Sequence, residues 1–191
     1  MRPPLPSLLD LPLIGATRRN HALEHATLHV LATKFPGRML GGHSNPTGFF
    51  IVGDVPLEAV AEAAIEALQR LRAGERNLAI HPGCGTNLAT TALLGGSLSW
   101  LVLRGARTNF GRILRLPMAL VLAAAGIVLS RPLGPVLQQR ITTDAEMGAL
   151  RVAGVRRSAR GRITAHRVLT ASGNAPIALT EAARRPLDGT T

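Results

Sequence analysis

Two uncharged apolar stretches are the strongest constraint on how this 191-residue chain folds. The first is TNLATTALLGGSLSWLVL, residues 86–103, and the second is LPMALVLAAAGIVLS, residues 116–130. A helix of about 18–20 apolar residues is long enough to cross the hydrocarbon core of a bilayer. The first stretch has this length, and the second reaches it if its helix continues to Leu137. We therefore expect a two-helix transmembrane hairpin at residues 86–137. A buried core hairpin of a soluble protein is the alternative.

The charge of the chain fits a membrane surface. The formal net charge is +11, and all but one of the 22 basic residues are arginines. Arginine clusters beside an apolar hairpin favour two partners, the lipid bilayer and its anionic headgroups. No nucleic acid is expected, because the chain has no zinc finger and no basic segment with interleaved aromatic residues. The sequence indicates no particular protein partner.

The orientation of the hairpin depends on where the arginines lie. They occur both between the apolar stretches, at residues 104–115, and after them, so the preference of positive charge for the cytoplasmic side does not decide it. The chain start lacks the pattern of a signal peptide, which favours a cytoplasmic N-terminus. Because two spans return the chain to the same side, we expect both termini in the cytoplasm, with the hairpin in the bacterial inner (cytoplasmic) membrane.

The segment RRNHALEHATLH, residues 18–29, holds three of the six histidines. His21, Glu24 and His25 spell H-x-x-E-H, and on a helix these three side chains share one face. Two imidazoles at positions i and i+4 can bind one metal ion, and a neighbouring carboxylate can deprotonate a metal-bound water. We therefore take His21 and His25 as candidate metal ligands and Glu24 as the candidate catalytic residue. A polar helix face that binds no ligand is the alternative.

A second motif, HPGCGTN at residues 81–87, carries the single cysteine. Its proline and glycines predict a tight turn, after which Thr86 or Asn87 would cap a helix. His81 and Cys84 are spaced so that both can reach one ion across the turn, and imidazole and thiolate are both good zinc ligands. The positive end of the helix dipole would also stabilise a thiolate at Cys84. His81 and Cys84 are therefore further metal candidates; a structural turn without metal is the alternative.

The rest of the chain predicts an α+β fold. The histidine-rich part should contain a helix from Thr17 or Asn20 to about Lys34, a β-hairpin within residues 38–55, a helix over residues 57–71 and a short strand or extended segment at residues 77–80. His43 should lie near the hairpin turn. The second helix carries a stripe of three glutamates, Glu58, Glu62 and Glu66. Either the stripe is solvated, or one of these glutamates supplies a third metal ligand.

The expected order of parts follows from these signals. It is an N-terminal arm at 1–17, a His-rich α/β head at 18–85, the transmembrane hairpin at 86–137, a basic amphipathic β segment at 138–171 and a disordered tail at 172–191. His166, inside the basic segment, is expected at the surface.

Together, RRNHALEHAT and HPGCGTN resemble the motifs of an uncharacterised family of small bacterial membrane proteins, a domain of unknown function. The resemblance covers residues 18–143 and implies an α/β head followed by a membrane hairpin, with no established activity. The H-x-x-E-H segment alone is similar to the motif of inverzincin metallopeptidases, which implies His21 and His25 as zinc ligands and Glu24 as general base. Inverzincins are much longer, two-lobed proteins.

These observations leave four hypotheses. The first is a membrane-anchored zinc-dependent hydrolase or peptidase that uses Glu24. The second is a structural or sensory zinc site in which His21, His25, His81 and Cys84 complete the coordination, which would suit a head with few aromatic residues. The third is a non-enzymatic membrane scaffold or interaction protein without metal. The fourth is cysteine chemistry with Cys84 as nucleophile and His81 or His25 as base.

Overall fold

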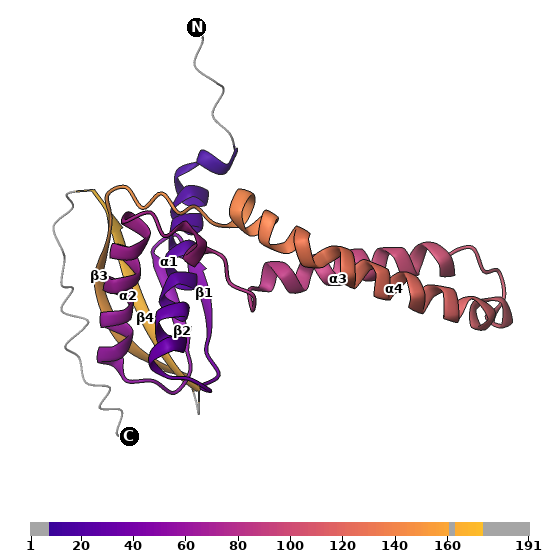
Figure 1. The fold of residues 1–191 in the computed structure, drawn as a ribbon, viewed down its shortest axis with the longest axis horizontal. Coiled ribbons are helices and arrows are strands. Elements are labelled where there is room, and N and C mark those ends of the chain that lie inside the picture. Colours follow the sequence, from indigo (N-terminus) through magenta and orange to yellow (C-terminus); the bar gives the residue numbers. More distant parts are fainter. Residues whose placement is uncertain (1–7, 161–162, 174–191) are drawn as a thin grey trace, which may run out of the picture. The chain divides into compact units, whose positions relative to one another are not determined.

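The computed structural model describes residues 8–160 and 163–173 and divides into two compact units (Figure 1). The head unit comprises residues 1–79 and 143–191, and the hairpin unit comprises residues 80–142. The predicted α+β class is confirmed, because the described residues contain four α-helices and one four-stranded antiparallel sheet. Most of the predicted tail, residues 174–191, and the first seven residues of the predicted arm lie outside the described residues.

Helix α1 (Pro12–Lys34) is the central element of the head. We expected an irregular arm as far as residue 17, but the helix already begins at Pro12. Proline is tolerated in the first turn of a helix, where its missing N–H has no partner to lose. A short 3-10 helix, η1 (Leu8–Asp10), precedes it. Every residue from Ala22 to Leu28 is buried, so these two turns of α1 are enclosed on all sides.

The four strands form one sheet in the order β1-β2-β4-β3. The predicted first hairpin is confirmed as β1 (Gly41–Asn45) and β2 (Gly48–Val52), although His43 lies mid-strand opposite Phe50 and not at the turn. The basic segment forms the second hairpin, β3 (Leu150–Arg160) and β4 (Ile163–Ser172). Because β4 pairs with β2, this segment is part of the head sheet and not a separate surface element.

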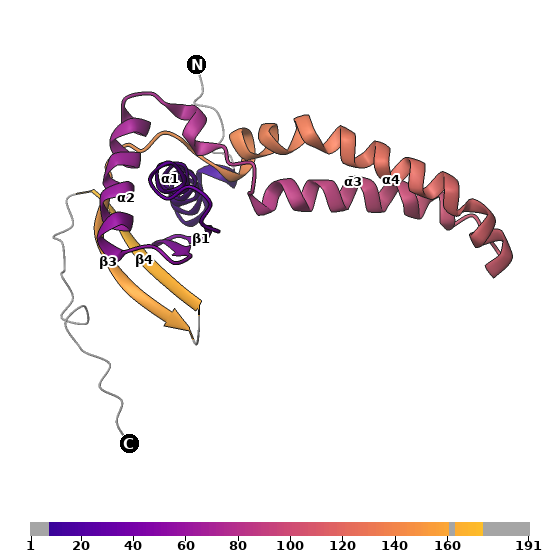
Figure 2. The ribbon, with the colours of Figure 1, turned by 60° about the horizontal axis from the view of Figure 1, so that its bottom comes forward.

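Helices α1 and α2 (Leu57–Arg72) cover one face of the sheet (Figure 2). Alternate residues of β2 face them, and Phe49 and Ile51 are fully buried between the two layers with Leu23, Leu31 and Val60. The expected short strand at residues 77–80 is instead a 3-10 helix, η2 (Arg76–Ala79). After the left-handed residue Gly74 the chain makes local turn hydrogen bonds, and so it does not extend to pair with a sheet edge.

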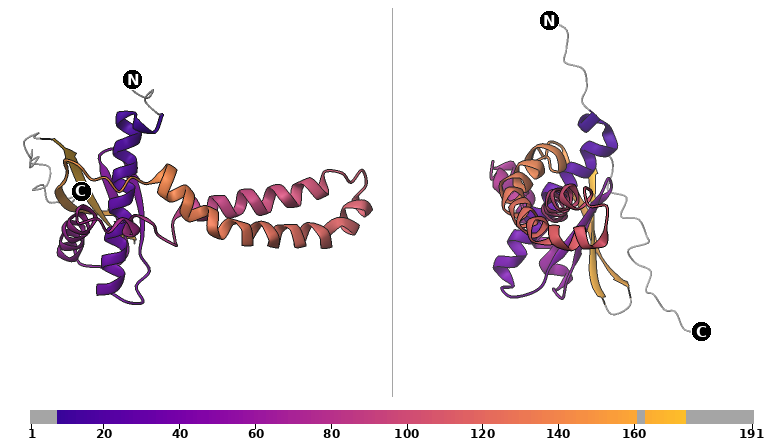
Figure 3. Two further views of the ribbon diagram at one scale, coloured as in Figure 1. Left: turned by 45° about the horizontal axis from the view of Figure 1, so that its top comes forward. Right: turned by 90° about the vertical axis from the view of Figure 1, so that its right-hand side faces the viewer.

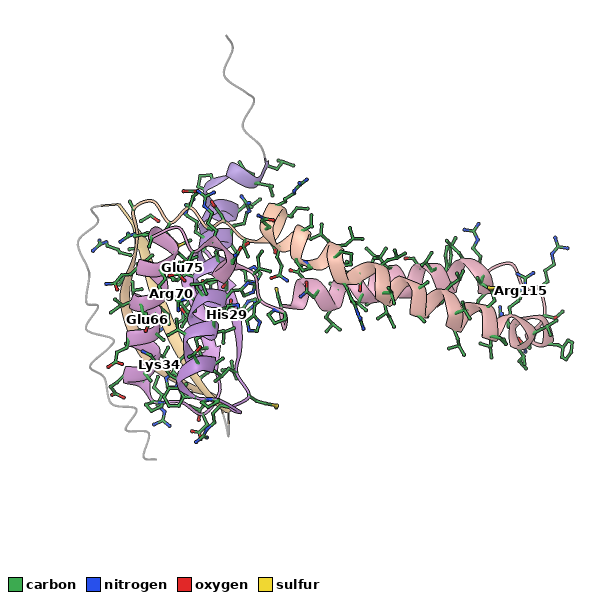
Figure 4. The ribbon with its side chains drawn as sticks, in the orientation of Figure 1. His29, Lys34, Glu66, Arg70, Glu75 and Arg115 are labelled. Carbon is green, nitrogen blue, oxygen red and sulfur yellow. The ribbon has the colours of Figure 1, made fainter. Side chains whose placement is uncertain are left out.

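The glutamates of α2 form the solvated stripe. Glu58 and Glu62 are exposed, and Glu66 pairs with Lys34 of α1 at 3.0 Å and with Arg70 at 3.8 Å (Figure 4). Arg70 also hydrogen-bonds Glu75, which lowers the pKa of that exposed carboxyl. The expectation that one of these glutamates supplies a third metal ligand therefore has no support in their positions.

The hairpin unit consists of α3 (Gly85–Leu103) and α4 (Asn109–Leu137), which pack along their lengths (Figure 3). A turn of π-helix (Gln138–Thr142) extends α4. Both helices are long and apolar enough to cross a membrane, and only 11% and 17% of their apolar windows are buried. The loop between them is shorter than the expected 104–115, because α4 begins at Asn109, where the Thr108 side chain accepts a hydrogen bond from the Gly111 N–H.

Candidate metal site on helix α1

His21, Glu24 and His25 lie on α1, as the H-x-x-E-H spacing predicts. His25 is 1% exposed and Glu24 is 3% exposed, while His21 is partly exposed. The imidazole rings of His21 and His25 lie edge to face with their centres 4.3 Å apart. One helical turn therefore holds two imidazoles close enough to share a metal ion, with a carboxylate next to them in the sequence.

The His25 ring is oriented by the backbone. Its Nδ1 lies 2.7 Å from the carbonyl oxygen of Ala79 in η2. A carbonyl oxygen only accepts, so Nδ1 carries the hydrogen, and in the neutral imidazole the lone pair is on Nε2. Histidines that bind metals typically donate their other ring N–H to a carbonyl or carboxylate in this way. His25 therefore has the orientation and tautomer of an Nε2 metal ligand.

The Glu24 carboxylate is held against strand β1. The Ser44 hydroxyl donates a hydrogen bond to Glu24 Oε2. Gly42 lies against the same side chain, because a Cβ atom at that position would be only 2.7 Å from Glu24 Cγ and closer still to its carboxylate. The absence of a side chain at Gly42 is therefore what allows the carboxylate to occupy this position.

Gly42→Ala is expected to lower the free energy of unfolding by about 1–2 kcal/mol, because the new methyl group must displace a buried but flexible carboxylate. The matched control is Gly41→Ala, where a Cβ meets no heavy atom within 4 Å, and it should leave stability unchanged. Denaturant unfolding measures both. Adding Glu24→Asp to Gly42→Ala should recover part of the loss, since the shorter carboxylate leaves room; no recovery would argue against a clash with Glu24.

In the hairpin unit, His81 and Cys84 have separate local roles. The Gly83 N–H donates a hydrogen bond to His81 Nδ1 at 3.1 Å. This hydrogen bond occupies the lone pair of Nδ1, and in the neutral imidazole the other ring nitrogen then carries the hydrogen. Cys84 is the N-cap of α3, and its sulfur accepts a hydrogen bond from the Thr86 N–H at 3.5 Å. The cap is thus Cys84 and not Thr86 or Asn87 as expected. The sulfur of Cys84 is therefore a better candidate metal ligand at this turn than the imidazole of His81.

Two polar residues of the head, His166 and Arg167, are buried although the sequence did not predict it. His166 of β4 is 2% exposed, not a surface residue, and its ring is held by a 2.9 Å hydrogen bond from Nε2 to the Val55 carbonyl. Its neighbour Arg167 is 4% exposed. The alternation of a strand puts these two side chains on opposite faces, but only the pairing of β4 with β2 buries both. No local pattern in the sequence carries that information.

The fold and the motif define a class of protein with a two-layer α+β head, a histidine–carboxylate helix at its centre and an apolar helical hairpin. The chain belongs to the family described as Domain of unknown function (DUF6391), whose model matches residues 16–155. An uncharacterized protein of Picosynechococcus sp. (strain ATCC 27264 / PCC 7002 / PR-6) is 37% identical over 153 residues, covering 73% of this chain and 70% of the relative. No solved structure matches the chain.

Proposed function

We propose that this chain is a membrane-anchored protein whose head binds a metal ion, with zinc as the expected metal. His21 and His25 would be ligands from α1, and Cys84, the single cysteine of the chain, is proposed as the third ligand. The observation that carries the proposal is the hydrogen bond between His25 Nδ1 and the Ala79 carbonyl, which supports His25 as an Nε2 ligand. Thiolate and imidazole together favour zinc over magnesium or calcium.

Chain connectivity supports the inclusion of Cys84. Ala79, whose carbonyl holds His25, precedes Cys84 by only five positions in the sequence. Five extended residues span at most about 17 Å, which is enough chain for Cys84 to reach a metal held by His25. A metal bound by both would join the start of the hairpin to the head.

The hairpin supports the membrane anchor. Its large apolar side chains are mostly exposed, including Leu93, Trp100 and Val121. Beside the loop, the Arg104 guanidinium lies 4.9 Å from the centre of the Trp100 ring. Arg115, labelled in Figure 4, donates to the Val102 carbonyl at 3.0 Å. Tryptophan and arginine at the end of an apolar helix are typical of a membrane–water interface. We also propose that both termini lie in the cytoplasm.

Metal content tests the site directly. Full-length protein purified in detergent is expected to contain about one zinc per chain, measured by elemental analysis, because His21, His25 and Cys84 would make a single site. His25→Ala should lose it. His43→Ala removes an exposed histidine from β1 and should keep the metal. Wild-type protein without metal, also after incubation with zinc, would refute the site and leave a non-enzymatic membrane scaffold.

A zinc-dependent hydrolase is the second candidate, and the position of Glu24 directly before His25 on α1, in the H-x-x-E-H spacing, favours it. A carboxylate there would take a proton from a metal-bound water and pass it to the leaving group. Glu24→Gln should then keep the zinc but lower peptide hydrolysis by about 10²–10⁴-fold. Zinc-loaded wild-type protein that hydrolyses no peptide in a mixed peptide library would exclude the hydrolase and leave a structural or sensory site.

A further inference from the structure

Arg167 of β4 is an almost fully buried cation without a carboxylate partner among the described residues. Its side chain is 4% exposed, and the ion pairs of the described parts of the chain are formed by other arginines and by Lys34. Taking a guanidinium out of water is costly unless an anion and good hydrogen bonds compensate for it. The position of Arg167 therefore calls for an anion.

One edge of this guanidinium is fixed in place. Nη2 donates to Asn45 Oδ1 at 2.8 Å and to Thr47 Oγ1 at 2.7 Å, both at the turn between β1 and β2. The Phe50 ring lies beneath, with its centre 4.5 Å from the guanidinium carbon. Nη1, by contrast, is buried and has no acceptor among the described residues. The protein thus orients the guanidinium but leaves one of its donor groups without an acceptor.

A second arginine lies directly across the sheet. Arg156 of β3 is the register partner of Arg167 and is exposed. Arg167 lies on the face opposite the helices, because Phe50, its register partner on β2, alternates with the buried core residues Phe49 and Ile51. Arg156 shares that face as the register partner of Arg167 on β3. Like charges directly opposite each other destabilise a sheet. Burial, and then the charge of Arg156, lower the pKa of Arg167.

We propose that Arg156 and Arg167 bind a phosphate group on the face of the sheet opposite α1 and α2. Two guanidinium groups match the charge of a phosphate better than that of a single carboxylate, and guanidinium forms paired hydrogen bonds with phosphate oxygens. Arg167 is the fixed donor through Nη1, and the exposed Arg156 closes over the anion from β3. The phosphate belongs either to a lipid headgroup or to a soluble phosphate compound. This site is separate from the proposed metal site.

The test uses full-length protein in a neutral detergent and has two arms. Inorganic phosphate is titrated by calorimetry at constant ionic strength, and retained dioleoylphosphatidylglycerol is measured by native mass spectrometry. Arg156→Gln and Arg167→Gln are each expected to weaken binding about tenfold or more, the loss typical of a charged hydrogen bond. Arg157→Gln is the matched control. It removes the same charge from the next position of β3, which faces the other side of the sheet, and should change binding by less than about twofold.

Either ligand bound with this pattern supports the site, and the arm that responds identifies the source of the phosphate. Because Arg167 is buried, its replacement can also destabilise the head, so circular dichroism accompanies each titration. Arg156 is exposed, and Arg156→Gln gives a decisive result in a folded protein. Wild-type protein that binds neither ligand, or equal weakening by Arg156→Gln and Arg157→Gln, would overturn the proposal.

Discussion

Gly126→Ala is expected to separate α3 from α4 and to cost about 3 kcal/mol of hairpin stability. A Cβ at Gly126 would lie 2.7 Å from the Cα and N atoms of Gly95 and 2.9 Å from the carbonyl carbon of Leu94. These obstacles are backbone atoms of the facing helix, which cannot rotate away, so the helices must move apart. Inserting a methyl group into such a contact typically costs about 1–3 kcal/mol, occasionally more.

Close packing matters here because of the proposed membrane setting. In lipid, apolar burial does not drive helices together, so close backbone contact and hydrogen bonds between helices hold them. The hairpin has such bonds between Thr91 and Ser130 at 2.7 Å, and from Ser99 to the Ala119 carbonyl at 3.1 Å. Gly126→Ala would weaken these bonds together with the glycine contact.

The matched control for Gly126→Ala is Gly96→Ala. A Cβ at Gly96 meets no heavy atom within 4 Å. Alanine favours a helix over glycine by about 1 kcal/mol, so this variant should be neutral or slightly stabilising. Fluorescence of Trp100, the single tryptophan of the chain, reports unfolding of the hairpin in detergent. Equal stability of the two variants would contradict the close approach of α3 and α4 at Gly126.

Much of the fold could be predicted because its signals are local. Pro56 and the alanine-rich run after it predict α2, and the Asn45–Gly48 turn between β-forming residues predicts the first hairpin. The uncharged runs predict α3 and α4. In each case, a few neighbouring residues determine the conformation by their own backbone preferences and hydrophobicity.

The missed features depend on residues far apart in the sequence. The pairing of β4 with β2 joins segments on either side of the hairpin unit, and alternation within β4 cannot reveal which strand lies beside it. The burial of His166 and Arg167 follows from that pairing. At the candidate site, the spacing of His21 and His25 was sufficient to place them together. The hydrogen bonds of His25 to Ala79 and of Glu24 to Ser44 were not predictable, because they need the tertiary packing of α1.

Gly48→Ala is expected to destabilise the head by about 4 kcal/mol, the largest stability effect among these variants. Gly48 has φ +137°, a backbone conformation that residues with a Cβ rarely adopt, and this strain costs about 2 kcal/mol. A Cβ would also lie 3.1 Å from Leu169 Cα, on backbone of the paired strand β4, which adds about 2 kcal/mol. Far-ultraviolet circular dichroism in denaturant measures the loss.

Gly41→Ala is again the control, since it adds the same methyl group to the same hairpin without a clash. The two variants should also differ in phosphate binding. Gly48 follows Thr47, whose hydroxyl holds Arg167, and the Thr47 carbonyl accepts a 3.1 Å hydrogen bond from the Thr170 N–H. A displaced turn would release the guanidinium, so folded Gly48→Ala should bind phosphate about tenfold more weakly. Wild-type stability in Gly48→Ala would contradict the register of β2 against β4, on which the proposed phosphate site depends.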